Sequence, residues 1–381
     1  MSVDTTYSFS NLKRDLSEVF ATINTMQHNL LSVVPIAPAA HHVKHEWLED
    51  TLEPISDALN GLIDEDDTPI TVDDGSKFAV GMILRFEGYA EQMLITSITG
   101  HDLTVTRGYG DTSGEAMVDN TVLYVLYNPK AEGTEAGYEA VTEPSTQYNY
   151  TQIFARTAKI SNTAKAVGHF GIDDVIDRAV WINLQMIQHE INNGIIFGQR
   201  YAHATDATVP RNMGGLLWYL SQVGTHATDA SAADISLDLL NNLIESIAKD
   251  GGRPDILLMN TVQARKLSAL NRTDGTEYIL RTEQSETKLG NYVREFISDL
   301  PMGFISKIVV DTSFPQDKIA LLSSDQMALV PLAGRAMSDF DASPAGADYT
   351  ARRVIGEYTL EFRNNLNSHG LLYNLDDTIG A

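Results

Sequence analysis

The chain has 381 residues, of which 43% are hydrophobic and 20% charged, a balance typical of a folded protein with room for two or three domains. Its 51 acidic and 27 basic residues give a formal charge of −24, which disfavours general binding to nucleic acid, and the absence of cysteine excludes disulfides and thiolate chemistry. The N-terminus lacks the apolar stretch of a signal peptide, and the longest apolar run, Val122–Tyr127, is far too short to span a membrane. We therefore expect a soluble protein of a reducing compartment.

The first 40 residues do not have the composition of a domain. Residues 11–29 place apolar side chains at helical spacing, namely Leu12, Leu16, Val19, Phe20 and Ile23. Residues 30–40 are predicted to be extended because they contain Pro35 and Pro38. Val33, Val34 and Ile36 lack an apolar partner inside this segment. We expect an arm that lies on another subunit and serves assembly rather than folding; a frayed terminus is the alternative.

Residues 63–128 form a stretch of short β segments separated by turns. The predicted strands are 69–72, 82–86, 92–98, 102–106 and 121–127. This spacing predicts a small antiparallel barrel or sandwich. Twelve acidic and three basic residues give the stretch a charge of −9, so we expect it to be well solvated and to lie on an outer surface.

The rest of the chain has mixed α and β character. Residues 128–146 are predicted to be a loop and residues 149–167 a long strand or a pair of strands. Apolar residues spaced by three or four predict a long helix over 172–197, which would serve as a structural backbone. Further helices are expected at 235–248 and 261–270. Strands are expected at 255–260, 307–311, 318–322, 327–332, 351–364 (most clearly over 358–362) and 370–374.

None of the candidate chemical motifs has the context that its chemistry requires. His41, His42 and His45 lie close together but lack the spacing of a helical zinc motif, so a surface turn is the expected structure. The glycine-rich RGYGDTSG (residues 107–114) lies between β segments, which favours a tight turn over a phosphate-binding loop. No GxSxG element marks a nucleophile. We expect no catalytic site, no metal and no cofactor, and a structural or interaction role instead of an enzyme.

The order of the segments nevertheless resembles that of a known family. KHEWLEDTL (residues 44–52) is followed by YNYTQIFARTAKISNTAKAV (148–167), the long helix, VVDTSFPQDKIALLSSDQMALVPL (309–332) and YTLEFRNNLNSHGLLYNL (358–375). In this order and spacing the chain resembles the major capsid proteins of tailed bacteriophages, which have the α+β Hong Kong 97-like fold. Within that family it is similar to the branch that has the NYTQIF segment before the spine helix.

The resemblance implies a division of the chain into the parts of that fold. Residues 1–42 would be the N-terminal arm, and 43–62 with 129–168 the two limbs of the extended loop (E-loop). Residues 63–128 would be a small all-β domain inserted in that loop. Residues 169–210 with 341–381 would form the peripheral domain, including a spine helix over 172–198, and residues 211–340 the axial domain.

The resemblance also implies a function. The chain would assemble into hexamers and pentamers of an icosahedral shell that encloses packaged viral double-stranded DNA without reading its sequence. It would be made in the host cytoplasm, end in the virion, and have no membrane partner. Portal, scaffold and decoration proteins would be its partners, and the inserted domain would decorate the outer surface or cement subunits together. The expected inter-subunit contacts are Val33, Val34, Ile36, Trp47, Phe154 and Arg156.

Two other functions remain open on the sequence alone. One is an encapsulin-like shell of a cellular compartment, which shares the fold. The other, of a different class, is a ligand-binding protein or enzyme that uses the β stretch for recognition.

Overall fold

The computed structural model describes residues 30–50, 56–130, 132–133, 144–167, 174–206, 208–273, 295–297 and 305–378. The predicted helix at 11–29 lies outside these residues. The chain divides into two compact units, a larger one of residues 1–47 and 146–381 and a smaller one, Leu48–Ser145.

The smaller unit contains a six-stranded antiparallel sheet in the order β2-β7-β4-β5-β6-β3. Its elements are β2 (Ser56–Ala58), β3 (Ile70–Thr71), the 3-10 turn η2 (Gly75–Lys77), β4 (Ile83–Phe86), β5 (Gln92–Thr99), β6 (Asp102–Thr106) and β7 (Val122–Tyr127). The two outer strands meet through an antiparallel bridge between Leu59 and Val72, with flanking backbone hydrogen bonds of 2.9 and 3.1 Å. The sheet therefore closes into a barrel, which leaves no long free edge.

All five β segments predicted between residues 63 and 128 are strands, but the barrel begins earlier than that range. β2 lies in the part predicted to be an E-loop limb, yet it pairs with β7 and completes the closure. Leu59 is fully buried in the barrel core, which it shares with Ile70, Val72, Phe86 and Leu123, among others. β2 was not predicted from the sequence, because its three residues, between a proline and a turn, are too few to show an alternation of apolar and polar side chains.

A buried ion pair organises the glycine-rich loop of the barrel. Glu91, with no exposed surface, accepts two parallel hydrogen bonds of 2.8 Å from the guanidinium of Arg107, and the amides of Gly108 and Glu115 each donate to it at 2.9 Å. The other guanidinium N–H groups donate to backbone carbonyls, those of Asp64, Asp67 and Glu115. Gly108 has φ +62°, which a side chain rarely adopts. The loop is thus structural, as the sequence predicts.

The larger unit contains the remaining elements. Its strands are β1 (Lys44–Glu49, which ends in the smaller unit), β8 (Ser145–Tyr150), β9 (Gln152–Ser161), β10 (His226–Asp229), β11 (Ile256–Met259), β12 (Glu295–Ile297), β13 (Ile305–Val310), β14 (Ile319–Leu322), β15 (Met327–Pro331), β16 (Ser338–Asp341), β17 (Tyr349–Phe362) and β18 (Gly370–Tyr373). Its helices are α1 (Asn162–Ala166), α2 (Val175–Phe197), α3 (Leu216–Trp218), the π turn η3 (Tyr219–Val223), α4 (Leu237–Lys249), α5 (Thr261–Thr273) and the 3-10 turn η4 (Ser324–Gln326).

One mixed sheet, in the order β10-β18-β14-β11-β13-β12, has an apolar core on each face. Along β11, Ile256 and Leu258 face the core that contains α2, while Leu257 and Met259 face α4 and α5. All four residues of β11 and of β14 are therefore buried. Gly370 on β18 lets α4 approach, because an added Cβ would lie 2.8 to 3.2 Å from Ile247 and Leu243.

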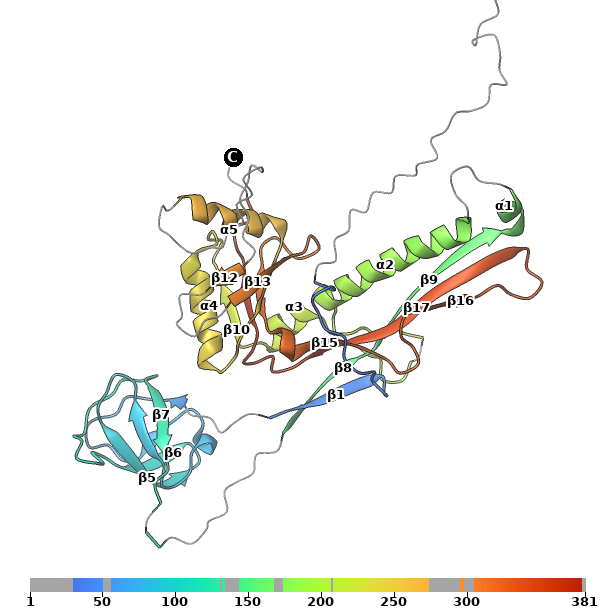
Figure 1. Cartoon of the computed structure of the whole chain (residues 1–381). Helices are drawn as coiled ribbons and strands as arrows, with labels where there is room; N and C mark the ends of the chain where they lie inside the picture. Colours follow the sequence, from blue (N-terminus) through green and yellow to red (C-terminus); the bar gives the residue numbers. More distant parts are fainter. Residues whose placement is uncertain are drawn as a thin grey trace, which may run out of the picture. The chain divides into compact units, whose positions relative to one another are not determined.

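The second sheet is built around β17, a strand of 14 residues that spans about 46 Å. β9 pairs with β17 along one side, and β16 and β15 pair with successive parts of the other side. α2 lies along β9 and β17 (Figure 1). Asp174 caps this helix by accepting from the amides of Ile176 and Asp177, so it begins three residues later than the spacing predicts.

Residues 30–40 are part of the larger unit rather than a detached arm. Leu30 is fully buried, and its amide donates to Asp311 at 3.3 Å. Residues 35–40 add a short parallel strand to β15, with bridges from Ile36 to Leu329 and from Ala40 to Leu332. The expectation that residues 1–40 contribute nothing to folding is therefore corrected for residues 30–40.

Barrel closure by β2 predicts where an independent fragment must begin. We expect residues 56–128, expressed alone, to give dispersed amide chemical shifts and a cooperative melt. Residues 63–128 should stay collapsed and exchange rapidly, because they lack β2 and the buried Leu59. Equal folding of both fragments would show that closure is dispensable.

The Glu91–Arg107 pair predicts a pH-dependent stability. Burial by itself would raise the pKa of Glu91, but the Arg107 guanidinium and the two backbone amides lower it below its ordinary value. A depressed pKa stabilises the fold at neutral pH, and this contribution is lost as the pH falls below about 4. Replacing Glu91 with Gln should cost about 3–5 kcal/mol in urea unfolding at neutral pH, because Arg107 stays buried without its partner. The exposed Glu87→Gln is the control, and the gap between the two variants should narrow in acid.

Candidate assembly surfaces

The segment that joins β8 to β9 is fixed to the larger unit by buried side chains. Asn149 has no exposed surface; its carbonyl oxygen accepts from the amide of Gly214 at 2.7 Å, and its amide nitrogen donates to the carbonyls of Gly214 and Leu360 at 3.0 and 2.7 Å. Gln152 accepts from the amide of Met213 at 3.2 Å. These bonds join β8, the loop before α3, and β17 at one point, so they set the direction in which β9 begins.

Contacts between cations and aromatic rings stabilise the same region, around the segment that joins β8 to β9. The ring of Tyr148 contacts two cations, the ammonium of Lys44, 4.2 Å from its centroid, and the guanidinium of Arg200, 4.1 Å from it. Arg200 also stacks on Trp218 at 4.4 Å and donates to the Tyr148 carbonyl at 2.9 Å. β1, β8 and the segment after α2 are thus held together without a disulfide.

Two glutamates on β17 complete this anchor. Glu357 is 2% exposed and accepts from Thr151 at 2.6 Å, from Arg211 at 3.0 Å and from Arg335 at 2.7 Å. Glu361 pairs with His45 of β1 at 3.1 Å. The hydrogen bond from His45, reinforced by Arg363 against the opposing effect of burial, lowers the pKa of Glu361, so this carboxylate is charged at neutral pH.

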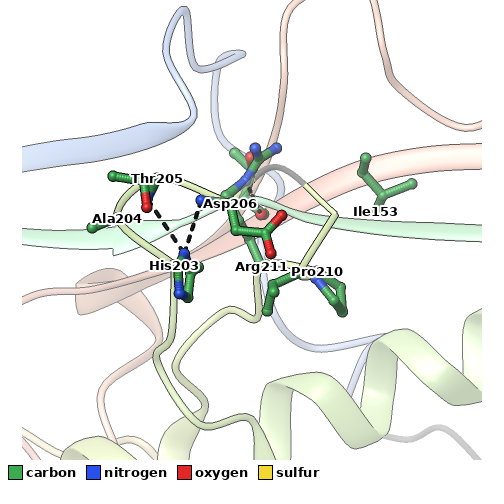
Figure 2. Close-up of a pocket in the computed structure, with 9 residues that line it drawn as sticks. Ile153, His203, Ala204, Thr205, Asp206, Pro210 and Arg211 are labelled. Atoms are coloured by element: carbon green, nitrogen blue, oxygen red, sulfur yellow. Dashed lines mark hydrogen bonds between the residues drawn. The ribbon is translucent and has the colours of Figure 1, made fainter.

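An open cavity of about 350 Å³ lies beside the start of β9 (Figure 2). His203 turns back on its own loop, where its Nδ1 accepts from the amides of Thr205 and Asp206 at 3.3 and 2.8 Å. The hydroxyl and amide of Thr208 lower the pKa of Asp206, which makes it a loop cap and a poor proton donor. Arg211 on the far wall is bound to Glu357. The lining residues therefore hold their loops in place and contain no nucleophile with an adjacent base.

Three of the six predicted inter-subunit contacts lie in the core of the subunit itself. Val34, Trp47 and Phe154 are only 5, 7 and 3% exposed and belong to the cluster that contains α2. Phe154 fits against Gly194, where an added Cβ would lie 2.6 Å from the end of the Met213 side chain and 3.3 Å from the ring. These three residues have almost no surface left for a neighbour, so the structure assigns them to folding. From the sequence alone, an apolar side chain that contacts a second subunit cannot be distinguished from one that is buried in its own subunit.

The other three predicted contacts differ from one another. Val33 is partly buried against the same core. Arg156 bonds to Glu190 of α2 at 2.6 and 2.9 Å, so it shares the α2 face of β9 with Phe154, as the two-residue spacing predicts. Ile36 is 73% exposed beside β15. Ile36 is thus the member of the set with the most surface for a second copy.

Sequence reasoning missed Asn149, Glu357 and Arg211. Asn149 lies within the quoted NYTQIF segment, but nothing in its spacing indicates a buried amide. For Glu357 a signal existed, since a glutamate inside a strand of otherwise buried residues requires a partner.

Metal and membrane features are also absent from the described ranges. No group of three or more histidine or carboxylate side chains there is arranged to hold a metal ion. In the same ranges, no helix combines the length and apolarity needed to cross a bilayer.

Comparison with known proteins gives a family and a fold. The family profile described as SU10 major capsid protein matches residues 1–376. A major capsid protein of Pseudomonas phage PaMx41 is 29% identical over 122 residues, which is 32% of this chain and 29% of that protein, so the match spans less than a third of the relative's length.

Two solved capsids resemble the chain over nearly their whole length. The capsid asymmetric unit of cyanophage A-1(L) matches with a TM-score of 0.57 and 10% identity, covering 98% of both chains. The capsid of a native GTA particle matches with a TM-score of 0.55 and 8% identity, covering 97% of both. At such identities the likeness concerns the fold, and it confirms the predicted α+β, Hong Kong 97-like class.

The position of residues 30–40 predicts different effects for two N-terminal deletions. Removing residues 1–29 keeps the buried Leu30 and Val34 and the strand on β15, so this deletion serves as the reference. Removing residues 1–40 should cost about 3 kcal/mol or more, because it also deletes the buried Leu30 and Val34 and the strand on β15. Calorimetry of both deletions checks this, and equal stability of the two would contradict the anchoring role of residues 30–40.

Proposed function

The chain belongs to the SU10 major capsid protein family, and from that premise we propose that it self-assembles into the icosahedral shell that encloses packaged viral double-stranded DNA. The observation that carries the proposal is the family match over nearly the whole chain, supported by a fold shared with solved capsids. Hexamers and pentamers of the subunit would build the shell. Assembly would take place in the host cytoplasm, and the product would be the virion capsid.

The charge of the chain suits a container for DNA. A formal charge of −24 repels the phosphate backbone, so packaged DNA can slide along the wall without adhering to it. The role is structural and non-catalytic, and it requires no cofactor. Without cysteine, the strength of the shell must come from extensive non-covalent contacts between subunits.

The closed barrel has the properties expected of a domain that decorates the outer surface of the shell or cements subunits together. It has a core of its own, and β2 and β7, which carry its two ends, are neighbours, so the insertion strains the host loop little. Its excess of acidic side chains is most stable in water. Portal, scaffold and separate decoration proteins would be further partners of the assembled shell.

Microscopy of the expressed chain tests the proposal directly. We expect closed shells in negative stain and, in a reconstructed map, the barrel density on the outside. A monodisperse small oligomer at every concentration would contradict the shell, and barrel density on the inner wall would contradict the surface role while leaving the shell intact.

A further inference from the structure

The chain contains two places where an asparagine precedes a glycine, Asn60–Gly61 and Asn193–Gly194. In such a pair the backbone nitrogen of the glycine can attack the side-chain carboxamide of the asparagine, because no Cβ shields that nitrogen. Both pairs offer the same chemistry, so their surroundings decide where it occurs.

Asn60–Gly61 lies on the surface of the barrel, directly after the bridge that closes it. The Asn60 side chain is exposed and forms no hydrogen bond with a described residue. Gly61 has φ +98°, and nothing lies within 4 Å of the position that a Cβ would take. The carboxamide is therefore free to turn toward the glycine nitrogen, and water can reach both groups.

A carboxylate already holds the proton that this attack must release. The amide of Gly61 donates to Oδ1 of Asp119 at 2.7 Å, a hydrogen bond strengthened by the charge of the acceptor. Oδ2 of the same carboxylate accepts from the side chain of Asn120 at 2.9 Å, which helps to orient it. A base at hydrogen-bond distance from the proton that it must remove is the geometry of general base catalysis.

The surroundings of Asn193–Gly194 are different. This pair lies inside α2, and the side chain of Asn193 bonds to His189 at 3.1 Å. An added Cβ at Gly194 would lie 2.6 Å from Met213, so the glycine is enclosed as well. The helix holds both residues in place, which makes this pair an internal control for the first.

We propose that Asn60 converts itself to aspartate or isoaspartate, with Asp119 as the base. The nitrogen of Gly61 attacks Cγ of Asn60 and gives its proton to Asp119. The Cγ–Nδ2 bond then breaks, and Nδ2 leaves as ammonia with that proton. The resulting succinimide ring adds one water molecule. Opening at Cγ gives aspartate, opening at the main-chain carbonyl gives isoaspartate, and no step is an oxidation or a reduction.

The product changes the barrel in two ways. Either opening adds a carboxylate to the Leu48–Ser145 unit, which already has 20 acidic and four basic residues. Isoaspartate also adds a carbon atom to the main chain, between the 2.9 Å bond from the Asn60 amide to Thr71 and the bond from Gly61 to Asp119. Because both bonds lie next to the closing bridge, the modified barrel should be less stable. The inference concerns the subunit itself and does not depend on shell assembly.

Peptide mass spectrometry of the full-length subunit, after prolonged incubation in neutral buffer, tests the site. We expect the peptide with Asn60 to gain the mass difference between a hydroxyl and an amino group. Its isoaspartate should be methylated by an isoaspartyl methyltransferase. The peptide with Asn193 should stay unchanged over the same period, and modification of Asn193 as fast as that of Asn60 would overturn the inference.

Asp119→Asn tests the base, because it keeps the size of the side chain and its acceptor oxygen but cannot take up the proton. In the folded subunit it should slow the modification of Asn60 at least about tenfold, and more in mildly acidic buffer, where hydroxide is scarce. Asp66→Asn, at an exposed position of the same barrel, is the matched control and should keep the wild-type rate. In urea all three proteins should react equally.

Equal rates in folded wild type and folded Asp119→Asn would show ordinary asparagine–glycine reactivity only and would overturn the role of Asp119. Should Asp119→Asn fail to fold, the decisive comparison is wild type folded against wild type in urea. Faster modification of Asn60 in the folded protein supports the inference, and equal or slower modification contradicts it.

Discussion

The buried carboxylate of Glu357 joins several segments of the larger unit at one point, and the rest of the unit is built around it. Glu357 lies where β17 exchanges β16 for β15 as its partner along one side, while β9 stays paired with it along the other. Its three hydrogen bonds come from the start of β9, from the segment before α3, and from the turn between β15 and β16. A buried charge is tolerated only when its partners are all in place. The cluster therefore ties β17, along which α2 lies, to three other segments of the larger unit.

Paired strands and fully hydrogen-bonded polar groups also explain how the chain accommodates the inserted barrel. β1 and β8 pair where the chain leaves the larger unit, and β2 and β7 pair where it enters the barrel. The two ends of the insertion are thus held together by two pairs of strands. The entropic cost of bringing these ends together is offset by this pairing, within the barrel and its host loop. The Glu91–Arg107 pair, with every guanidinium donor used, then makes the acidic barrel compatible with a small apolar core.

The local periodicity of apolar residues was enough to predict most helices and strands. The order of the segments that resemble the capsid family was enough to predict the fold. The helices α2, α4 and α5 and the five barrel strands that the sequence predicted have a repeating apolar pattern, and each was found within a few residues of its expected bounds. What failed depended on long-range contacts. Val34, Trp47 and Phe154 look unpartnered in sequence because their partners lie far away along the chain, in α2 and β17. Asn149 and Glu357 have roles set by atoms of distant loops, which no spacing can reveal.

The distribution of charge restricts how such subunits can approach one another. The Leu48–Ser145 unit carries −16 of the formal charge of −24, so the other 283 residues carry −8. Like-charged units repel within a Debye length, about 8 Å at physiological salt, which opposes contacts between two barrels. Contacts between copies are cheapest where acids are scarce and apolar side chains are half exposed.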